Sequence, residues 1–302
     1  MTKKLFIIGN GFDLYHGIDT RYYSFANYLK ENDYRTYEIV EEYIIPEIDL
    51  WSDLEILLAD IDTDSIIDNA EQYLISYADE EWSDSYHHDY EFEIEKICDA
   101  VSKDLLDNFS HWVRQIEIEN FRRVHLKCID KNALFLNFNY TNTLQKIYSV
   151  SNDRILHIHG SAMNDSSPLI LGHGWQRKEY ELLSRSNDEN TDVRVAGGNE
   201  LIDDLLSRTF KPTKKIICKN KAFFNRLHTV TEVFVLGHSL SEIDKPYFVE
   251  ILKKVRPDAT WTISYYVKKG EVESNVKDAT KHAAEEIGIP TSRLKLSLLE
   301  NL

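Results

Sequence analysis

Four polar segments, each directly after an apolar run, contain residue types that bind or cleave small molecules. They are Gly9–Asp13, Asn137–Asn142, His157–Ser161 and Gly237–Asp244. In an open parallel sheet the ligand crevice lies outside the carboxyl ends of the strands. If the apolar runs are strands of one such sheet, the four segments meet and form one site.

The glycine turn and the asparagines each have a simpler structural interpretation as well. Gly9 and Gly11 let the backbone approach a phosphate, whose charge is favoured by free amides at a helix N-terminus. Leu14 replaces the third glycine of the G-x-G-x-x-G dinucleotide motif, so an ordinary strand-to-helix turn fits equally well. At least one asparagine of the second segment caps the following helix, and Asp244 either caps a helix or holds a ribose hydroxyl.

His157 and His159 lie two residues apart on a predicted strand and therefore point to the same face. A metal pair is one interpretation, but no further Cys, His or carboxylate ligand follows at a recognisable spacing. Gly160 indicates that the strand ends at His159 and leaves its imidazole at the mouth of the crevice. His157 also fits a buried, hydrogen-bonded structural role.

Strands alternate with helices in the parts of the chain that contain these segments. The apolar runs predict strands over residues 4–8, 133–138, 154–160, 168–174, 231–239, 259–267 and 293–299. Helical patterns cover residues 141–150, 214–228, 243–255 and 271–288, and a polar stretch without a predicted element extends to residue 209. This alternation predicts an α/β fold with a Rossmann-type, mostly parallel sheet flanked by helices.

Residues from about 22 to 126 have a different pattern, with acidic stretches in which apolar residues recur every three or four positions. We therefore expect a single α/β domain over residues 1–302 with an inserted helical lobe at about 22–126. The lobe offers more apolar faces than one thin sheet covers, so we expect a homo-oligomer in which some helices contact another subunit.

The composition excludes several classes of protein. With 35 Lys and Arg against 51 Asp and Glu, the formal charge of the 302 residues is −16, which disfavours broad nucleic-acid binding and docking on anionic membranes. No apolar run approaches the ~20 residues of a membrane span, and residues 1–8 enter a glycine turn without a signal-peptide cleavage site. The three cysteines are far apart, which argues against a disulfide framework. We expect a cytoplasmic protein.

Six segments resemble, in order, the bacteriophage abortive-infection family AbiH. They are GNGFDLYHGIDTRYYSF, WSDLE, NFNYTNTL, HIHGS, LILGHG and VFVLGHSLSEID. The same segments resemble a divergent sirtuin-like NAD-binding domain: GNGFD stands at the G-A-G turn, FNYT at the T-x-N-x-D segment, HIHGS at the catalytic histidine and GHSL at the G-x-S loop. Thr141 stands at the Asp of that motif, and the four zinc-binding cysteines of deacetylase sirtuins are absent.

The two resemblances imply an antiphage effector that hydrolyses NAD to nicotinamide and ADP-ribose, acts after a phage-derived trigger, needs no metal and is not a peptide deacetylase. They imply that His159 is the general base and that Asn139 orients the water and the ribose. The residues expected to bind NAD are Gly9, Asn10, Gly11, Phe12, Asp13, Thr141, Gly237, Ser239 and Asp244. The turn 9–13 would hold the diphosphate and the fourth segment the adenosine end.

The sequence also suggests a structural feature and two alternative functions. Position alone suggests a lid over the nicotinamide formed by His16, Arg21 and Tyr22. One alternative function is a sensor that binds NAD or ADP-ribose without cleaving it, because Thr141 replaces a carboxylate. Another is a metal-dependent nuclease that would use a histidine set of His157, His159 and His173.

Overall fold

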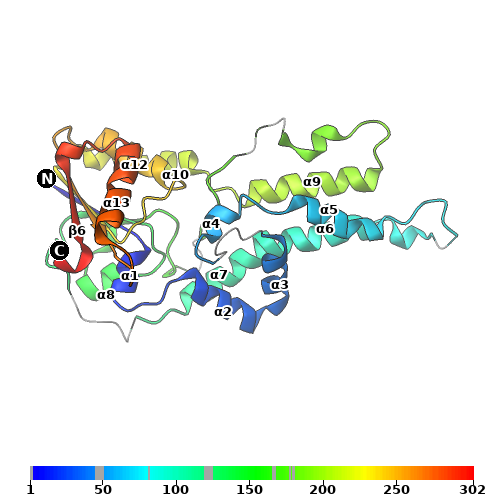
Figure 1. Cartoon of the computed structure of the whole chain (residues 1–302), viewed down its shortest axis with the longest axis horizontal. Coiled ribbons are helices and arrows are strands. Elements are labelled where there is room, and N and C mark those ends of the chain that lie inside the picture. Colours follow the sequence, from blue (N-terminus) through cyan, green and yellow to red (C-terminus); the bar gives the residue numbers. More distant parts are fainter. Residues whose placement is uncertain are drawn as a thin grey trace. The chain divides into compact units, whose positions relative to one another are not determined.

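The chain folds into two compact units in the computed structural model. The structure describes residues 3–44, 51–80, 82–118, 125–164, 168–176, 178 and 181–302. The sheet unit consists of Met1–Arg21, Val113–Ile170 and Pro212–Leu302, and the helical unit of Tyr22–Trp112 and Leu171–Lys211. Figure 1 labels their elements along the chain. The helical unit thus contains most of the predicted insertion and a second segment that we had placed with the sheet.

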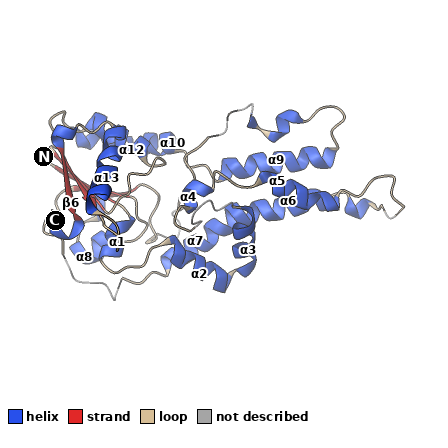
Figure 2. Cartoon of the chain, viewed as in Figure 1, coloured by secondary structure: helices blue, strands red, loops and turns tan. Residues whose placement is uncertain are grey.

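The sheet unit contains six parallel strands in the order β3-β2-β1-β4-β5-β6. The strands are β1 (Lys4–Ile8), β2 (Leu134–Asn137), β3 (Ile155–His157), β4 (Glu232–Leu236), β5 (Thr260–Tyr265) and β6 (Leu294–Leu298). Figure 2 shows these strands in red between blue helices. The all-parallel order confirms the predicted α/β class, and β1 lies in the middle, paired with β2 and β4.

The helices of this unit cover both faces of the sheet. They are α1 (Asn10–Tyr15), α8 (Thr143–Tyr148), α10 (Thr213–Lys219), α11 (Lys221–Asn225), α12 (Lys245–Lys254) and α13 (Glu273–Ile287). Alternate residues of β1 enter different cores: Leu5 packs with residues of α10 to α13, whereas Phe6 packs with residues of α1 and α8. Burial on both faces explains why the strands are continuous apolar runs. The helix predicted over 214–228 is interrupted at Asn220, between α10 and α11.

The helical unit contains α2 (Tyr22–Asn32), α3 (Tyr34–Tyr43), α4 (Leu54–Leu57), α5 (Thr63–Ala70), α6 (Asp89–Asp99), most of α7 (Leu105–Arg114) and α9 (Val193–Arg208). A short π-helical turn, η3 (Ala100–Asp104), joins α6 to α7. Asp33 and Asp62 cap α3 and α5 by accepting backbone hydrogen bonds. None of the described helices combines the length and apolar character that a membrane span requires.

Two predictions for residues 168–209 are wrong. The strand expected over 168–174 is absent from its described residues, where His173 makes only an isolated bridge to Phe210. The polar stretch contains α9, which packs beside α6 in Figure 1. Gly197 and Gly198 lower the helix propensity of α9, but a Cβ on Gly198 would come within 2.7 Å of Tyr90 on α6. Gly198 therefore allows the two helices to approach closely.

Candidate functional site at the carboxyl edge of the sheet

The parallel sheet brings the four polar segments to one edge. They begin at or directly after the last residues of β1, β2, β3 and β4, and these four strands are neighbours in the sheet. The strand that we expected to end at His159 ends at His157. The turn after β1 is bonded to the end of β4, because Gly9 N donates to Leu236 O at 3.0 Å and Gly11 N donates to Gly237 O at 2.7 Å. The predicted meeting of the four segments at a common edge is therefore confirmed.

The glycines of this edge are explained by contact between two backbone turns. A Cβ on Gly9 would lie 2.6 Å from the Cα of His238, and a Cβ on Gly237 would lie 2.1 Å from the nitrogen of Phe12. Gly237 also has φ of 64°, a conformation that favours glycine. The amides of Gly9 and Gly11 donate to carbonyls within the protein, and the amide of Gly237 donates to Ser264 Oγ at 2.8 Å. The prediction that these amides are free for a phosphate is wrong.

Other residues of the first segment are fixed within the protein. Phe12 is fully buried in the core on one face of the sheet, so its side chain is not a ligand contact. Asn10 is exposed and its amide donates to Thr20 O at 3.2 Å. His16 is also fully buried, with Nδ1 donating to Phe12 O at 2.7 Å and Nε2 lying 2.8 Å from the hydroxyl of Tyr148. His16 is therefore not part of a flexible lid, so that expectation is wrong for His16 and stays a prediction for Arg21 and Tyr22.

Asp13 and Thr141 form a buried pair below the edge. The Thr141 hydroxyl donates to Asp13 Oδ2 at 2.5 Å and lies 3.1 Å from the hydroxyl of Thr143. Burial raises the pKa of Asp13 to about 6 from an ordinary 3.8, against the opposing effect of these hydrogen bonds. Oδ1 of Asp13 has no hydrogen-bond partner among the described residues. The threonine that stands at the Asp of the sirtuin motif thus binds another carboxyl group.

Asn139 lies in a turn that hydrogen bonds hold on three sides. Asn137 Oδ1 accepts from Asn139 N at 3.1 Å, and Asn139 Nδ2 donates to Gly9 O at 3.1 Å. His157 Nδ1 donates to Asn139 O at 3.0 Å, while Gln145 Nε2 lies 3.1 Å from His157 Nε2. Burial lowers the pKa of His157, so the ring is neutral at pH 7. His157 is half-buried and hydrogen-bonded, so the interpretation of a hydrogen-bonded structural residue is confirmed, whereas full burial is not.

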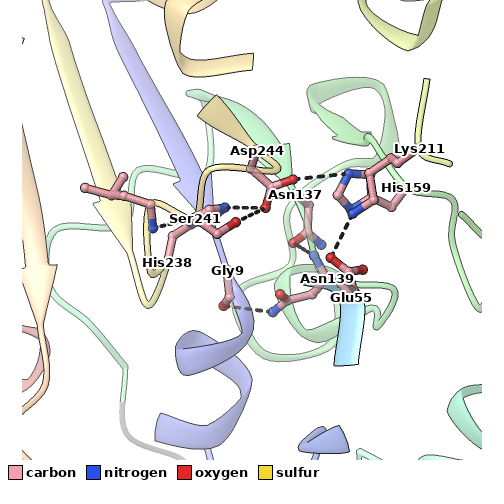
Figure 3. A network of polar contacts seen from close by, with 10 residues as sticks. Gly9, Glu55, Asn137, Asn139, His159, Lys211, His238, Ser241 and Asp244 are labelled. Carbon is pink, nitrogen blue, oxygen red and sulfur yellow. Dashed lines mark hydrogen bonds and ion pairs between the residues drawn. The ribbon is translucent and has the colours of Figure 1, made fainter. Parts of the chain in front are cut away.

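Asp244 lies between two imidazoles, as Figure 3 shows. Its Oδ1 is 3.7 Å from His159 Nε2, and its Oδ2 is 3.4 Å from His238 Nε2. Ser241 Oγ donates to the same Oδ2 at 3.3 Å. The side chains of both histidines are 4% exposed and that of Asp244 is 11% exposed. A carboxylate beside an imidazole orients the ring and stabilises its protonated form, so this arrangement suits a general base.

The full extent of the site is visible only in the structure. We expected Asp244 at the adenosine end of NAD, whereas the structure places it beside His159, the residue expected at the nicotinamide end. His238 was not predicted to have a role, although it stands inside the fourth segment. Phe138 packs against both imidazoles, with ring centroids 5.3 Å from His159 and 4.5 Å from His238. Ser239 is exposed at the same edge.

Comparison with known proteins identifies the family. The model of the family described as "Bacteriophage abortive infection AbiH" matches residues 5–265, a range that includes all four polar segments. The chain belongs to the AbiH family. No curated protein and no solved structure matches it. Membership connects this AbiH chain with abortive infection by bacteriophage and confirms that part of the sequence-based prediction.

The AbiH site combines an imidazole and a carboxylate, side chains that can transfer protons. Among the residues that the structure describes, no group of three or more His, Cys, Asp or Glu side chains is placed to hold a metal ion. His157, which the nuclease alternative would use, is already bonded to Asn139 and Gln145. The features available for chemistry are the imidazole of His159, the carboxylate of Asp244 and the Asn139 turn.

Proposed function

We propose that this AbiH protein is an abortive-infection effector that hydrolyses NAD to nicotinamide and ADP-ribose. The observation that carries the proposal is the nearly buried pair of His159 and Asp244, 3.7 Å apart at the carboxyl edge of a Rossmann-like sheet. Dinucleotides bind at this edge in folds of this class. The resemblance of the four segments to the NAD-binding segments of sirtuins supports the choice of NAD.

The chemistry requires one base and accurate positioning. Water attacks C1′ of the nicotinamide ribose, and the bond from C1′ to the pyridinium nitrogen breaks with its electrons on that nitrogen. Nicotinamide leaves as a neutral molecule, so no general acid is needed for the leaving group. The proton of the water passes to His159, and the carboxylate of Asp244 stabilises the resulting imidazolium before the proton returns to solvent.

The other predicted residues have narrower roles in this proposal. Asn139 orients the water and the ribose through its side-chain oxygen, because its Nδ2 already donates to Gly9 O. The exposed side chain of Ser239 is available to the ADP part of the substrate. Asn10 is exposed as well, but its amide would first have to release Thr20 O. A phage-derived trigger and assembly into a homo-oligomer complete the proposal. Light scattering tests the assembly, and a strict monomer at all concentrations would contradict it.

Nicotinamide release tests the proposed reaction. The purified protein is incubated with NAD and the products are separated by chromatography. We expect nicotinamide and ADP-ribose from the wild type, about 10²-fold to 10⁴-fold less from His159→Ala, and no loss from His282→Ala, which removes an exposed histidine on α13. The same measurement in infected cells supplies the trigger. Unchanged NAD in both settings would refute the proposal.

A sensor that binds NAD without cleaving it is the second candidate, and one observation favours it. Thr141 replaces the carboxylate of the sirtuin motif, and its hydroxyl is bound to the buried Asp13. Calorimetric binding of NAD with no nicotinamide release, both without and with the trigger, would identify the protein as a sensor.

A further inference from the structure

We infer that His238 is a positioning residue that holds Asp244 in the orientation in which its carboxylate faces His159. Its effect on turnover rests on the proposed function, whereas the positioning itself can be measured without any reaction. His238 lies within the segment 237–244, and the sequence patterns of this segment indicate no role for it.

The hydrogen bonds of His238 determine where its proton lies. Leu240 N donates to His238 Nδ1 at 2.9 Å. Because Nδ1 accepts this bond, the single proton of the neutral ring is on Nε2. That nitrogen lies 3.4 Å from Asp244 Oδ2, so the ring presents a donor to the carboxylate. The other tautomer would place a lone pair against a negative oxygen.

The backbone of the segment is shaped to make this contact. Leu240 has φ of 61°, a left-handed conformation that is uncommon for a residue with a Cβ and persists only where the surrounding structure holds it. Leu240 is nevertheless buried, and its amide is directed at the ring of His238. The left-handed turn therefore serves to fix the ring.

Asp244 receives two donors on one oxygen and faces His159 with the other. Ser241 Oγ and His238 Nε2 both lie near Oδ2, at 3.3 Å and 3.4 Å, and Oδ1 is 3.7 Å from His159 Nε2. Phe138 packs edge-on against both rings and limits their rotation. The carboxylate thus has one orientation in which all three contacts are made at once.

Two substitutions test the contributions of the two ring nitrogens of His238 separately. His238→Asn keeps an acceptor near the position of Nδ1, which preserves the bond from Leu240, but removes the donor to Asp244. His238→Gln keeps a donor near the position of Nε2. We expect the Asn variant to lose tenfold or more in kcat for nicotinamide release, with KM for NAD and melting temperature little changed, and the Gln variant to recover part of this loss. Wild-type kcat in the Asn variant, or equal losses in both variants, would overturn the inference.

Nuclear magnetic resonance tests the positioning without turnover. In the wild type we expect the ¹⁵N spectrum to show His238 with an unprotonated Nδ1 and a protonated Nε2. In His238→Asn the ¹³C resonance of the Asp244 carboxyl should shift while the Leu240 amide keeps its position. A proton on Nδ1, or an unmoved Asp244 resonance, would overturn the inference even in an active enzyme. The expected spectra in a protein that cleaves no NAD would refute only the proposed function.

Discussion

The two units of this AbiH chain bury charge in different ways. In the helical unit Arg194 is 3% exposed, pairs with Asp192 at 2.6 Å and donates to Ile75 O at 2.9 Å. Its guanidinium also lies 4.3 Å from the ring centroid of Tyr77. In the sheet unit Asp13 is fully buried and no cation among the described residues pairs with it, so its carboxyl depends on hydrogen bonds.

This difference separates a buried charge that supports the fold from one that costs stability. A buried ion keeps its charge at low cost when opposite charge and hydrogen bonds replace water, as they do for Arg194. Without a counter-charge, desolvation dominates and raises the pKa of Asp13 to about 6. Groups of this second kind concentrate at functional sites. The raised pKa of Asp13 is therefore of the kind that functional sites favour. Arg194, with its partners Asp192, Ile75 and Tyr77 (the Arg194 cluster), has the contacts of a structural link.

Replacement of the site residues should have the largest effect, and it should be on turnover rather than on binding. His159→Ala removes the proposed base and Asn139→Ala the orienting amide, so we expect losses of about 10²-fold to 10⁴-fold in kcat. The loss of the bond from Asn139 Nδ2 to Gly9 O costs only about 1 kcal/mol of stability. Chromatography of nicotinamide, calorimetry of NAD binding and thermal melting measure the three quantities.

These measurements also distinguish a catalytic role from a structural one. If Asn139 only joins two turns and His159 is only a packed strand-end residue, activity will fall in proportion to the unfolded fraction. Wild-type cleavage by either variant, or a loss that follows the melting temperature, would contradict the proposed roles.

The strands and the polar segments after them were predictable because their signals are local. A strand buried on both faces is an uninterrupted apolar run such as Lys4–Ile8, and a glycine or asparagine shows where it ends. The chain therefore indicated where the edge of the sheet lies. Family resemblance then indicated Asn139 and His159, both of which the sheet brings to that edge.

The features that were missed depend on contacts between distant residues. In the sequence, the glycines of the first and fourth segments suggest a phosphate site. In the structure, glycine is needed at each of these positions because a Cβ there would come too close to the facing turn. The role of His238 depends on a left-handed Leu240, which no propensity predicts. Helix α9 was missed because Gly197 and Gly198 lower its propensity, whereas packing on α6 stabilises it.

Arg194→Ala should be the most destabilising of the structural changes, at about 3 kcal/mol, because it leaves Asp192 without its cation and Ile75 O without its donor. The Arg194 guanidinium holds the pKa of Asp192 below its ordinary 3.8. A lowered pKa stabilises the fold above about pH 4 and this contribution is lost as the pH falls through the folded-state value. Urea unfolding at pH 7 and pH 3 measures both effects.

Arg194→Lys is the matched control, because it keeps the positive charge and loses the bidentate hydrogen bonds to the Asp192 carboxylate. We expect the free energy of unfolding of Arg194→Lys to lie between that of the wild type and that of Arg194→Ala. Equal stability of all three proteins at pH 7 would show that the cluster is not a structural link and would remove the contrast with Asp13.

Asp13→Asn should change how stability depends on pH. Because the folded-state pKa of about 6 exceeds the ordinary 3.8, the wild type loses stability as the pH rises from about 4 through 6. The difference between these two pKa values corresponds to about 3 kcal/mol in the free energy of unfolding. Relative to the wild type, the Asn variant should gain up to that amount between pH 4 and pH 7 in urea unfolding. Asp278→Asn, which removes an exposed carboxyl group, should show no such gain.

The smallest effects should come from the glycines of α9, and they should have opposite signs. A Cβ on Gly198 meets Ile94 Cδ1 and Tyr90 Cε1 at 2.7 Å each, and both of these side chains are fully buried. Overpacking of this kind costs about 1 to 3 kcal/mol, more than the ~1 kcal/mol that alanine adds to helix propensity. Gly198→Ala should therefore lower the free energy of unfolding.

Gly197 is the matched position, one residue away on the same helix. A Cβ there would lie 2.1 Å from Oε1 of Glu91, the end of a flexible side chain that is about one-third exposed and can move aside. The gain in helix propensity then remains, so Gly197→Ala should be neutral or stabilise by up to ~1 kcal/mol. Urea unfolding of the two variants decides the matter. If both variants are destabilised equally, the glycines of α9 are needed for the backbone conformation or backbone contacts, as at the sheet edge. If only Gly198→Ala is destabilised, the glycine of the helical unit is needed to make room for the side chains of α6.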